Sequence, residues 1–256
     1  MSSSRYFSAT VAWPPGYALL ELGEIDSTNE EARRRAKAGE GRSLWIVASR
    51  QSAGRGRRGN AWQSSPGNLF ATLLLRPEKP AGECAQLSFV AALAVSDMLG
   101  RVAPRTEFSL KWPNDVLAGE RKIAGILLES ESGADGMAAW LAVGIGVNLA
   151  DFPEDTEFPA ISLAALGAAP PAPKDALLHL AARFAKWYEV WRSAGFAPVR
   201  EAWLARAAGL GARIRVRLAN EEKYGVFHGI DDSGALLLGL PGGGVRAIAA
   251  GEVFLG

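Results

Sequence analysis

The chain has 256 residues, of which 48% are hydrophobic and 21% charged, and its formal net charge is +1. This length allows one large domain, or a domain of about 200 residues with a small second one, and a core that needs no disulfides. The near-zero charge gives no global attraction to a polyanion, and one cysteine (Cys84) with two histidines (His179 and His228) excludes an intramolecular disulfide and argues against a zinc site.

Helical and extended segments alternate through the first 150 residues. A helix is predicted over 26–38, where Asp26 or Ser27 can cap it and Glu30 lies three residues after Ser27. Two later apolar strands, joined by the turn sequence ESGADGM, predict an antiparallel hairpin. In chain order the other expected elements are a strand at 44–49, a strand at 68–75, a buried helix at 85–102, a strand at 108–112 and the hairpin strands 122–130 and 139–149.

The pattern changes twice after the hairpin. Residues 151–173 are rich in Pro and Ala and predict an irregular segment. An amphipathic helix follows over 174–195, and its aromatic stripe is typical of a core face rather than a ligand site. Short strands at 212–218, 222–230, 234–240 and 244–255 then predict a small barrel, so we place the domains at 1–208 and 209–256.

The N-terminal sequence does not resemble a signal peptide, because Pro14-Pro15-Gly16 interrupts it and no apolar run of roughly 7–15 residues is present. No later segment approaches the roughly 20 continuous apolar residues of a membrane span. With a single cysteine, these features predict a cytoplasmic protein without a membrane partner.

Residues 49–59 read SRQSAGRGRRG, and Gly54, Gly56 and Gly59 fit the G-x-G-x-x-G pattern of a dinucleotide-binding turn. Such a turn must open a helix, whereas NAWQSSPGN follows here and leads into a strand. The alternative uses the arginines: glycines allow close backbone approach, and guanidinium groups bind phosphate or carboxylate. A loop of this kind can close over an anion; an exposed basic turn is the other interpretation.

Two further stretches carry polar groups beside predicted strands. KWPNDV (111–116) places Lys111, Asn114 and Asp115 at a strand end, where open α/β sheets bind ligands. RKIAGIL (121–127) places Lys122 at the start of an apolar strand with Gly125 inside it. Taken singly, each lysine is more typical of a solvated surface position.

Together these segments resemble the motif set of biotin–protein ligases. The motifs are DSTN (26–29), QSAGRGRRG (51–59), Trp62, GNL (67–69), KWPND (111–115), RKIAGIL (121–127) and GIGVN (144–148). The resemblance covers residues 22–165 and continues more weakly through GIDDSGALLL (229–238). It implies an α/β (α+β) fold, with a mixed-sheet catalytic domain like class II aminoacyl-tRNA synthetase cores and a C-terminal SH3-like barrel.

The resemblance also implies a reaction. Such enzymes use ATP with Mg²⁺ to convert biotin to biotinyl-5′-AMP, and then transfer biotin to one lysine of a biotin carboxyl carrier protein. It implies Lys122, Arg57 and Arg55 as catalytic residues, with no resident metal site. The implied biotin-binding residues are Ser27, Thr28, Asn29, Gln51, Gly54, Arg55, Gly56, Arg57, Trp62, Lys122, Gly125, Gly144 and Gly146. The implied ATP-binding residues are Arg57, Arg58, Lys111, Asn114, Asp115, Lys122 and Asn148.

For several of these residues a purely structural role is an alternative to the assigned function. Ser27 or Asp26 can serve only as a helix cap, and Trp62 can fill core. Gly144 and Gly146 can serve only close strand packing, and Asp115 can serve only to orient Lys111.

The sequence departs from the family at three places. Only 26 residues precede Ser27, so we expect no N-terminal DNA-binding domain and no specific DNA binding. The chain ends GEVFLG, without the family's C-terminal ATP-contacting arginine, and FPAISL (158–163) matches the adenine-side region loosely.

Three other functions compete with this interpretation. A lipoate– or octanoate–protein ligase shares the fold and the adenylate chemistry. Arg213, Arg215 and Arg217 share one strand face, to which Arg246 can add, and could bind nucleic acid, although such a pattern is more typical of a solvated strand face. A catalytically silent biotin-binding protein is the third, and the loop arginines with Lys122 argue against it. A homodimer is compatible with the family.

Overall fold

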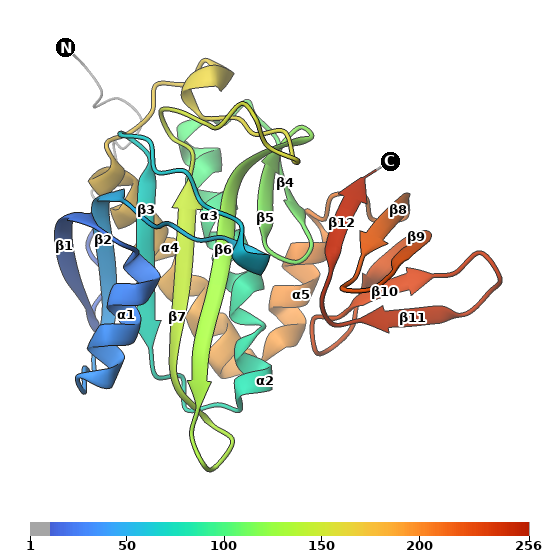
Figure 1. The fold of residues 1–256 in the computed structure, drawn as a ribbon, viewed down its shortest axis with the longest axis horizontal. Coiled ribbons are helices and arrows are strands. Elements are labelled where there is room, and N and C mark those ends of the chain that lie inside the picture. Colours follow the sequence, from blue (N-terminus) through green and yellow to red (C-terminus); the bar gives the residue numbers. More distant parts are fainter. Residues whose placement is uncertain (1–10, 256) are drawn as a thin grey trace.

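The computed structural model describes residues 11–255 and contains two β-sheets (Figure 1). The larger sheet has seven strands in the order β1-β2-β3-β7-β6-β5-β4. β1 runs parallel to β2, and every other neighbouring pair is antiparallel, so the sheet is mixed. Its strands are β1 (Tyr17–Ile25), β2 (Ser43–Gln51), β3 (Leu69–Leu75), β4 (Phe108–Lys111), β5 (Asp115–Ala118), β6 (Arg121–Ser132) and β7 (Ala138–Val147).

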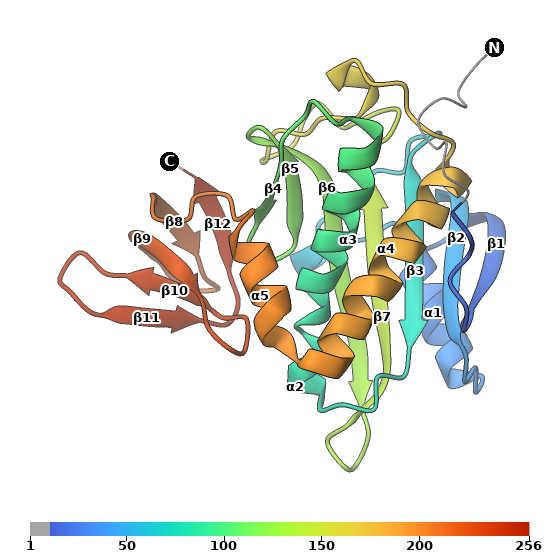
Figure 2. The same cartoon turned by 180° about the vertical axis from the view of Figure 1, so that it is seen from behind.

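Helices cover the two faces of this sheet unequally. The short α1 (Thr28–Lys37) lies alone against the face seen in Figure 1. The opposite face carries α3 (Leu87–Val102) and α4 (Pro173–Ala194), with α5 (Phe196–Leu204) beside them (Figure 2). The face with α1 is therefore the less covered one, which leaves room for a site.

The segment Ala81–Val102, formed by α2 (Ala81–Cys84) and α3, is long and apolar enough to match a membrane span by composition. In the fold, 72% of its most apolar window is buried inside the protein. The apolar residues of α3 pack under the sheet and against α4 and α5. This is how the central helix of a globular core is composed.

The smaller sheet is antiparallel and holds five strands in the order β11-β10-β9-β8-β12. It lies at one end of the molecule, next to β4 and α5 (Figures 1 and 2). Its strands are β8 (Arg213–Arg217), β9 (Glu222–Ile230), β10 (Leu236–Gly239), β11 (Val245–Ile248) and β12 (Glu252–Leu255). The predicted fold class, a mixed-sheet α/β domain with a small antiparallel C-terminal unit, is confirmed.

Most predicted elements are present, including the β6–β7 hairpin and the core-facing stripe of α4. Four helices or strands were not predicted: β1, α2, β5 and α5. β1 is a half-buried edge strand whose glutamates obscure its alternation. α5 contains Pro198, which lies in the first turn, where the missing N–H costs no helical hydrogen bond. The N-terminal residues 1–10, part of the stretch in which no signal peptide is expected, lie outside the described residues.

Candidate active site

A pocket opens on the α1 face of the large sheet. Above it runs the connection between β2 and β3, residues 52–68, which we call the glycine–arginine loop (Figure 1). The floor comes from β6 and β7, one end from the start of α1, and the other end from β5 and β12. The pocket encloses about 130 Å³ of free space. Segments far apart in the sequence therefore meet at one place, as the order of motifs suggested.

The end of the pocket near α1 is a wall of buried, uncharged polar groups. Thr28 donates its backbone N–H to Oε1 of Gln51 at 2.8 Å, and its hydroxyl lies 2.8 Å from that of Thr72. The Thr72 hydroxyl also lies 2.6 Å from Oδ1 of Asn29. Because these groups are interlocked and at most 5% exposed for Thr28, Asn29 and Thr72, their orientations are preset.

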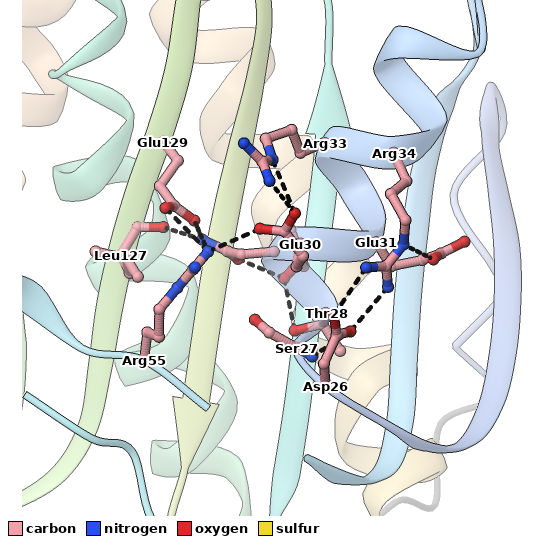
Figure 3. Close-up of polar contacts among 12 residues, drawn as sticks. Asp26, Ser27, Thr28, Glu30, Glu31, Arg33, Arg34, Arg55, Leu127 and Glu129 are labelled. Carbon is pink, nitrogen blue, oxygen red and sulfur yellow. Dashed lines mark hydrogen bonds and ion pairs between the residues drawn. The ribbon is translucent and has the colours of Figure 1, made fainter. Parts of the chain in front are cut away.

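Ser27 belongs to the same wall. It is the N-cap residue of α1, but its side chain makes no capping hydrogen bond. Asp26 does not cap the helix either: its Oδ1 accepts the backbone N–H of Ser27, and its carboxylate pairs with Arg34 (Figure 3). The helix-cap role is therefore wrong for the Ser27 side chain, which lies 4% exposed against the pocket.

Three glycines let side chains approach the sheet backbone closely. A Cβ added to Gly144 would lie 2.2 Å from Oδ1 of Asn29, and one added to Gly146 would lie 2.4 Å from the Trp62 ring. At Gly125 an added Cβ would lie 3.0 Å from both Trp62 and Lys122. The space at these glycines is thus taken up by Asn29 and Trp62, which form the inner surface of the pocket.

A carboxylate flanked by two ammonium groups occupies the other end. Asp115 lies 2.6 Å from Nζ of Lys122 and 3.4 Å from Nζ of Lys111. Burial alone would raise the pKa of Asp115, but the two lysines outweigh it and the pKa lies below its usual value. Burial lowers the pKa of Lys111, against the opposing effect of Asp115. The Lys111 ammonium also lies 3.7 Å from the centroid of the Phe158 ring.

Backbone pairing holds Lys122 in place. Its N–H donates to the carbonyl of Pro159 at 2.7 Å, and its carbonyl accepts the N–H of Ile161 at 2.9 Å. This pairing also brings Phe158 to the rim of the pocket. Asp115 does more than orient Lys111, because its carboxylate contacts the ammonium groups of both Lys111 and Lys122.

The arginines of the glycine–arginine loop each contact an oxygen of the protein. Arg55 lies between Glu30 and Glu129 (Figure 3). Arg57 donates to the carbonyl of Gly251 at 3.2 Å, and burial lowers its pKa.

Arg58 points to the small sheet, where it pairs with Glu252 and the carbonyl of Arg217. The loop is thus held at both ends of the pocket, by α1 and β6 through Arg55 and by the small sheet through Arg57 and Arg58.

Most of the predicted site residues line this one pocket, and three do not. Gly54 lies at the base of the loop, where its carbonyl accepts the N–H of Trp62. Arg58 faces the small sheet, and the Asn148 side chain donates to the carbonyl of Ile161 at 3.2 Å. The residues brought together are Ser27, Thr28, Asn29, Gln51, Arg55, Gly56, Arg57, Trp62, Lys111, Asn114, Asp115, Lys122, Gly125, Gly144 and Gly146.

Sequence reasoning missed several lining residues. Phe158 lies in FPAISL, which matched the family's adenine-side region only loosely. Glu252 lies in the strand predicted at 244–255, where no pattern indicated a site. Asn60, Ala61, Trp112 and Pro113 adjoin the motifs, and could have been found as their neighbours.

Two family models match the chain. One, described as the Biotin/lipoate A/B protein ligase family, matches residues 24–148, and the other, described as the Biotin protein ligase C terminal domain, matches residues 209–256. The first model covers the pocket-lining residues from Ser27 to Gly146 and describes a broad group of biotin and lipoate protein ligases.

Similar proteins with known names restrict the assignment to biotin ligases. A biotin–[acetyl-CoA-carboxylase] ligase of Paracoccus denitrificans is 48% identical over 92% of this chain and 99% of its own. The bifunctional ligase/repressor BirA of Bacillus subtilis is 32% identical over 94% of this chain and 75% of its own. The biotin protein ligase from Aquifex aeolicus, solved in complex with biotin and ATP, superposes with a TM-score of 0.80 at 30% identity, over 93% of this chain and 98% of that one. The chain belongs to the biotin protein ligase family.

Proposed function

We propose that the protein is a biotin–[biotin carboxyl carrier protein] ligase. It activates biotin with ATP to biotinyl-5′-AMP, and then transfers biotin to a lysine of the carrier. The observation that carries the proposal is the pairing, in one pocket, of a neutral polar wall with the Lys111–Asp115–Lys122 cluster. Family membership, and the relatives that act on acetyl-CoA carboxylase or bind biotin and ATP, support it.

In the first step a carboxylate oxygen of biotin attacks the α-phosphorus of ATP, and pyrophosphate leaves. Both reactants are anions, so catalysis needs cations fixed where they meet, and no protein nucleophile. Lys122 lies centrally, between Asp115 and the Trp62 ring. We assign it to the biotin carboxylate and the α-phosphate, with Arg57 and Arg55 closing over the anhydride.

The neutral wall suits the ureido ring of biotin, whose carbonyl and N–H groups need uncharged partners. We assign Ser27, Thr28, Asn29 and Gln51 to this ring, and Trp62 to the wall beside it. ATP then lies toward Lys111, Asn114 and Asp115.

Mg²⁺ fits this site as an ion carried by the ATP phosphates. It prefers phosphate oxygens, water and one or two carboxylates to an all-protein cage. Among the described residues no group of three His, Cys, Asp or Glu side chains could hold a metal ion. Asp115 is the carboxylate placed to meet it.

In the second step the acceptor amine attacks the acyl carbon, AMP leaves, and the amine loses a proton. We propose a biotin carboxyl carrier domain as acceptor and a cytoplasmic location, where carrier and ATP are available and a free thiol such as the buried Cys84 is stable. A homodimer is compatible with this proposal.

The proposal includes no nucleic-acid partner. Two of the three arginines of the suggested basic face are paired, Arg215 with Glu222 and Arg217 with Glu157 and Glu252. Arg246 pairs with Glu221. Because these guanidinium groups are paired and the net charge is only +1, little positive charge is available to bind the phosphates of a nucleic acid.

The test is ATP–pyrophosphate exchange with biotin, with lipoate and with neither acid. We expect exchange with biotin alone, followed by label transfer to a carrier domain and none to a carrier whose target lysine is replaced by arginine. Faster exchange with lipoate would favour the lipoate ligase. Biotin binding without exchange would indicate a silent binding protein.

A further inference from the structure

Glu129 contacts both the neutral wall and the glycine–arginine loop, although no motif identifies it. It lies on β6, four residues beyond Gly125, against two residues that line the pocket, Asn29 and Arg55. One of its oxygens accepts from Nδ2 of Asn29 at 2.7 Å, and both lie 3.2–3.4 Å from Nη2 of Arg55 (Figure 3). It is thus a carboxylate shared between a fixed element and a loop.

The contact with Asn29 decides which way that amide points. An ionised carboxylate only accepts hydrogen bonds, so the amide nitrogen must face Glu129. Nδ2 also lies 3.4 Å from the carbonyl of Leu127, while Oδ1 accepts from the Thr72 hydroxyl at 2.6 Å. Turned by 180°, the amide would set an oxygen against the carboxylate, so Glu129 fixes the polarity of the wall at Asn29.

The contact with Arg55 is of a different kind. All its distances exceed 3.1 Å, and the Arg55 side chain is 45% exposed, so the pairing is weak and reversible. Glu30 shares the same Nη2 at 3.3 Å and is itself paired with Arg33. Arg55 therefore exchanges readily to a better anion.

We infer that Glu129 is a positioning residue that orients Asn29 and holds Arg55 at the rim until a carboxylate ligand replaces it. The inference rests on the proposed function, because it assigns that ligand to biotin. Glu129 thereby links the glycine–arginine loop to the neutral wall. Its side chain orients the Asn29 amide and keeps Arg55 beside the pocket. Glu129 itself touches neither substrate.

Two substitutions separate the two roles. Glu129→Gln keeps an oxygen that accepts from Asn29 but removes the charge that holds Arg55. Glu129→Leu removes both. Glu131→Gln is the matched control, because it lies on the same strand and its glutamine still accepts from Trp140.

The first measurement is amide hydrogen exchange of the loop without added ligand. Loss of an exposed ion pair should speed exchange at 54–61 by roughly two- to fivefold in both Glu129 variants, and not in Glu131→Gln. In an Arg55→Ala background, Glu129→Gln should have no further effect, because the pair is already absent.

The second measurement is biotin binding by calorimetry. Glu129→Gln should keep the dissociation constant within about threefold of wild type. Glu129→Leu leaves a buried amide donor without its main acceptor, and should weaken binding at least about fivefold. Thermal melts serve as the fold control.

The outcomes separate this inference from the proposed function. Unchanged loop exchange in Glu129→Gln, or an equal effect in the Arg55→Ala background, overturns it. So does unchanged biotin affinity in Glu129→Leu. A wild-type protein that binds no biotin refutes the proposed function, and the exchange measurement, which uses no ligand, still decides whether Glu129 holds the loop.

Discussion

Replacing Lys122 by methionine tests the cation that we place between the two reacting anions. Its Nζ lies 2.6 Å from Asp115, and its side chain is 25% exposed. Methionine keeps most of the stem volume but carries no charge and donates no hydrogen bond. Loss of one such contact costs about 3–4 kcal/mol of transition-state stabilisation, which is roughly 10²–10³ in rate. We expect biotin-dependent pyrophosphate exchange to fall by that factor.

The same substitution has a cost for folding. At an effective dielectric of about 20, charges 2.6 Å apart attract by about 6 kcal/mol before desolvation is subtracted. Lys111 remains as a second partner of Asp115 at 3.4 Å, so we set the net loss at about 2–3 kcal/mol, below the usual cost of breaking a buried pair. In a protein of this size that lowers Tm by about 4–12 °C. The protein stays folded at 25 °C, where exchange is measured.

Two controls separate catalysis from stability. Lys37→Met, on the exposed side of α1, should change neither exchange nor Tm. Adding Asp115→Asn to Lys122→Met takes the carboxylate from the buried Lys111, so Tm should fall further while exchange stays low. Exchange within a few-fold of wild type in Lys122→Met would refute the role of Lys122 as the central cation.

Three further predictions follow from the geometry. Gly144→Ala should weaken biotin binding at least about tenfold in calorimetry, because its Cβ would lie 2.2 Å from Asn29, whereas Gly23→Ala, with open space around it, should bind normally. Amide exchange in the glycine–arginine loop should slow when biotin and ATP are added, and equal protection with and without them would contradict its role as a closing loop. The hydrogen bonds from Arg34 lower the pKa of Asp26 to about 2, so this pair stabilises the fold above about pH 4 and is lost as the pH falls toward 2. Because the pair is almost half exposed, urea unfolding of Asp26→Asn at pH 7 should show a loss below about 1 kcal/mol, and none at pH 2.

The site was predictable where its residues are close in sequence and chemically distinctive. Lys111 and Asp115 flank Pro113, and the turn that this proline forces brings both into the pocket. The hairpin could also be predicted, because two long apolar strands with a short polar turn have few other arrangements.

Partners from distant segments could not be predicted. Glu252 enters the pocket only because the small sheet lies against the loop, and no local pattern encodes that contact. The same holds for Arg55, which lies between two carboxylates from α1 and β6. Arg57 and Arg58 are likewise next to oxygens of the distant residues Gly251 and Glu252, which no pattern within the loop predicts.

The pocket is chemically divided, and the division matches the chemistry of the proposed substrates. The side chains of Thr28, Asn29 and Gln51 are themselves neutral, whereas Lys111 and Lys122 belong to the charged part of the pocket. A neutral ring with an anionic tail, bound in one orientation, puts its carboxylate at the charged part and its ring at the neutral wall. The reversed orientation would take the substrate carboxylate away from both lysines and place it at the neutral wall, near the Glu129 carboxylate, which is costly. The distribution of charge therefore sets the direction of the substrate before any step of the reaction, and Lys122 lies where the neutral and charged parts meet.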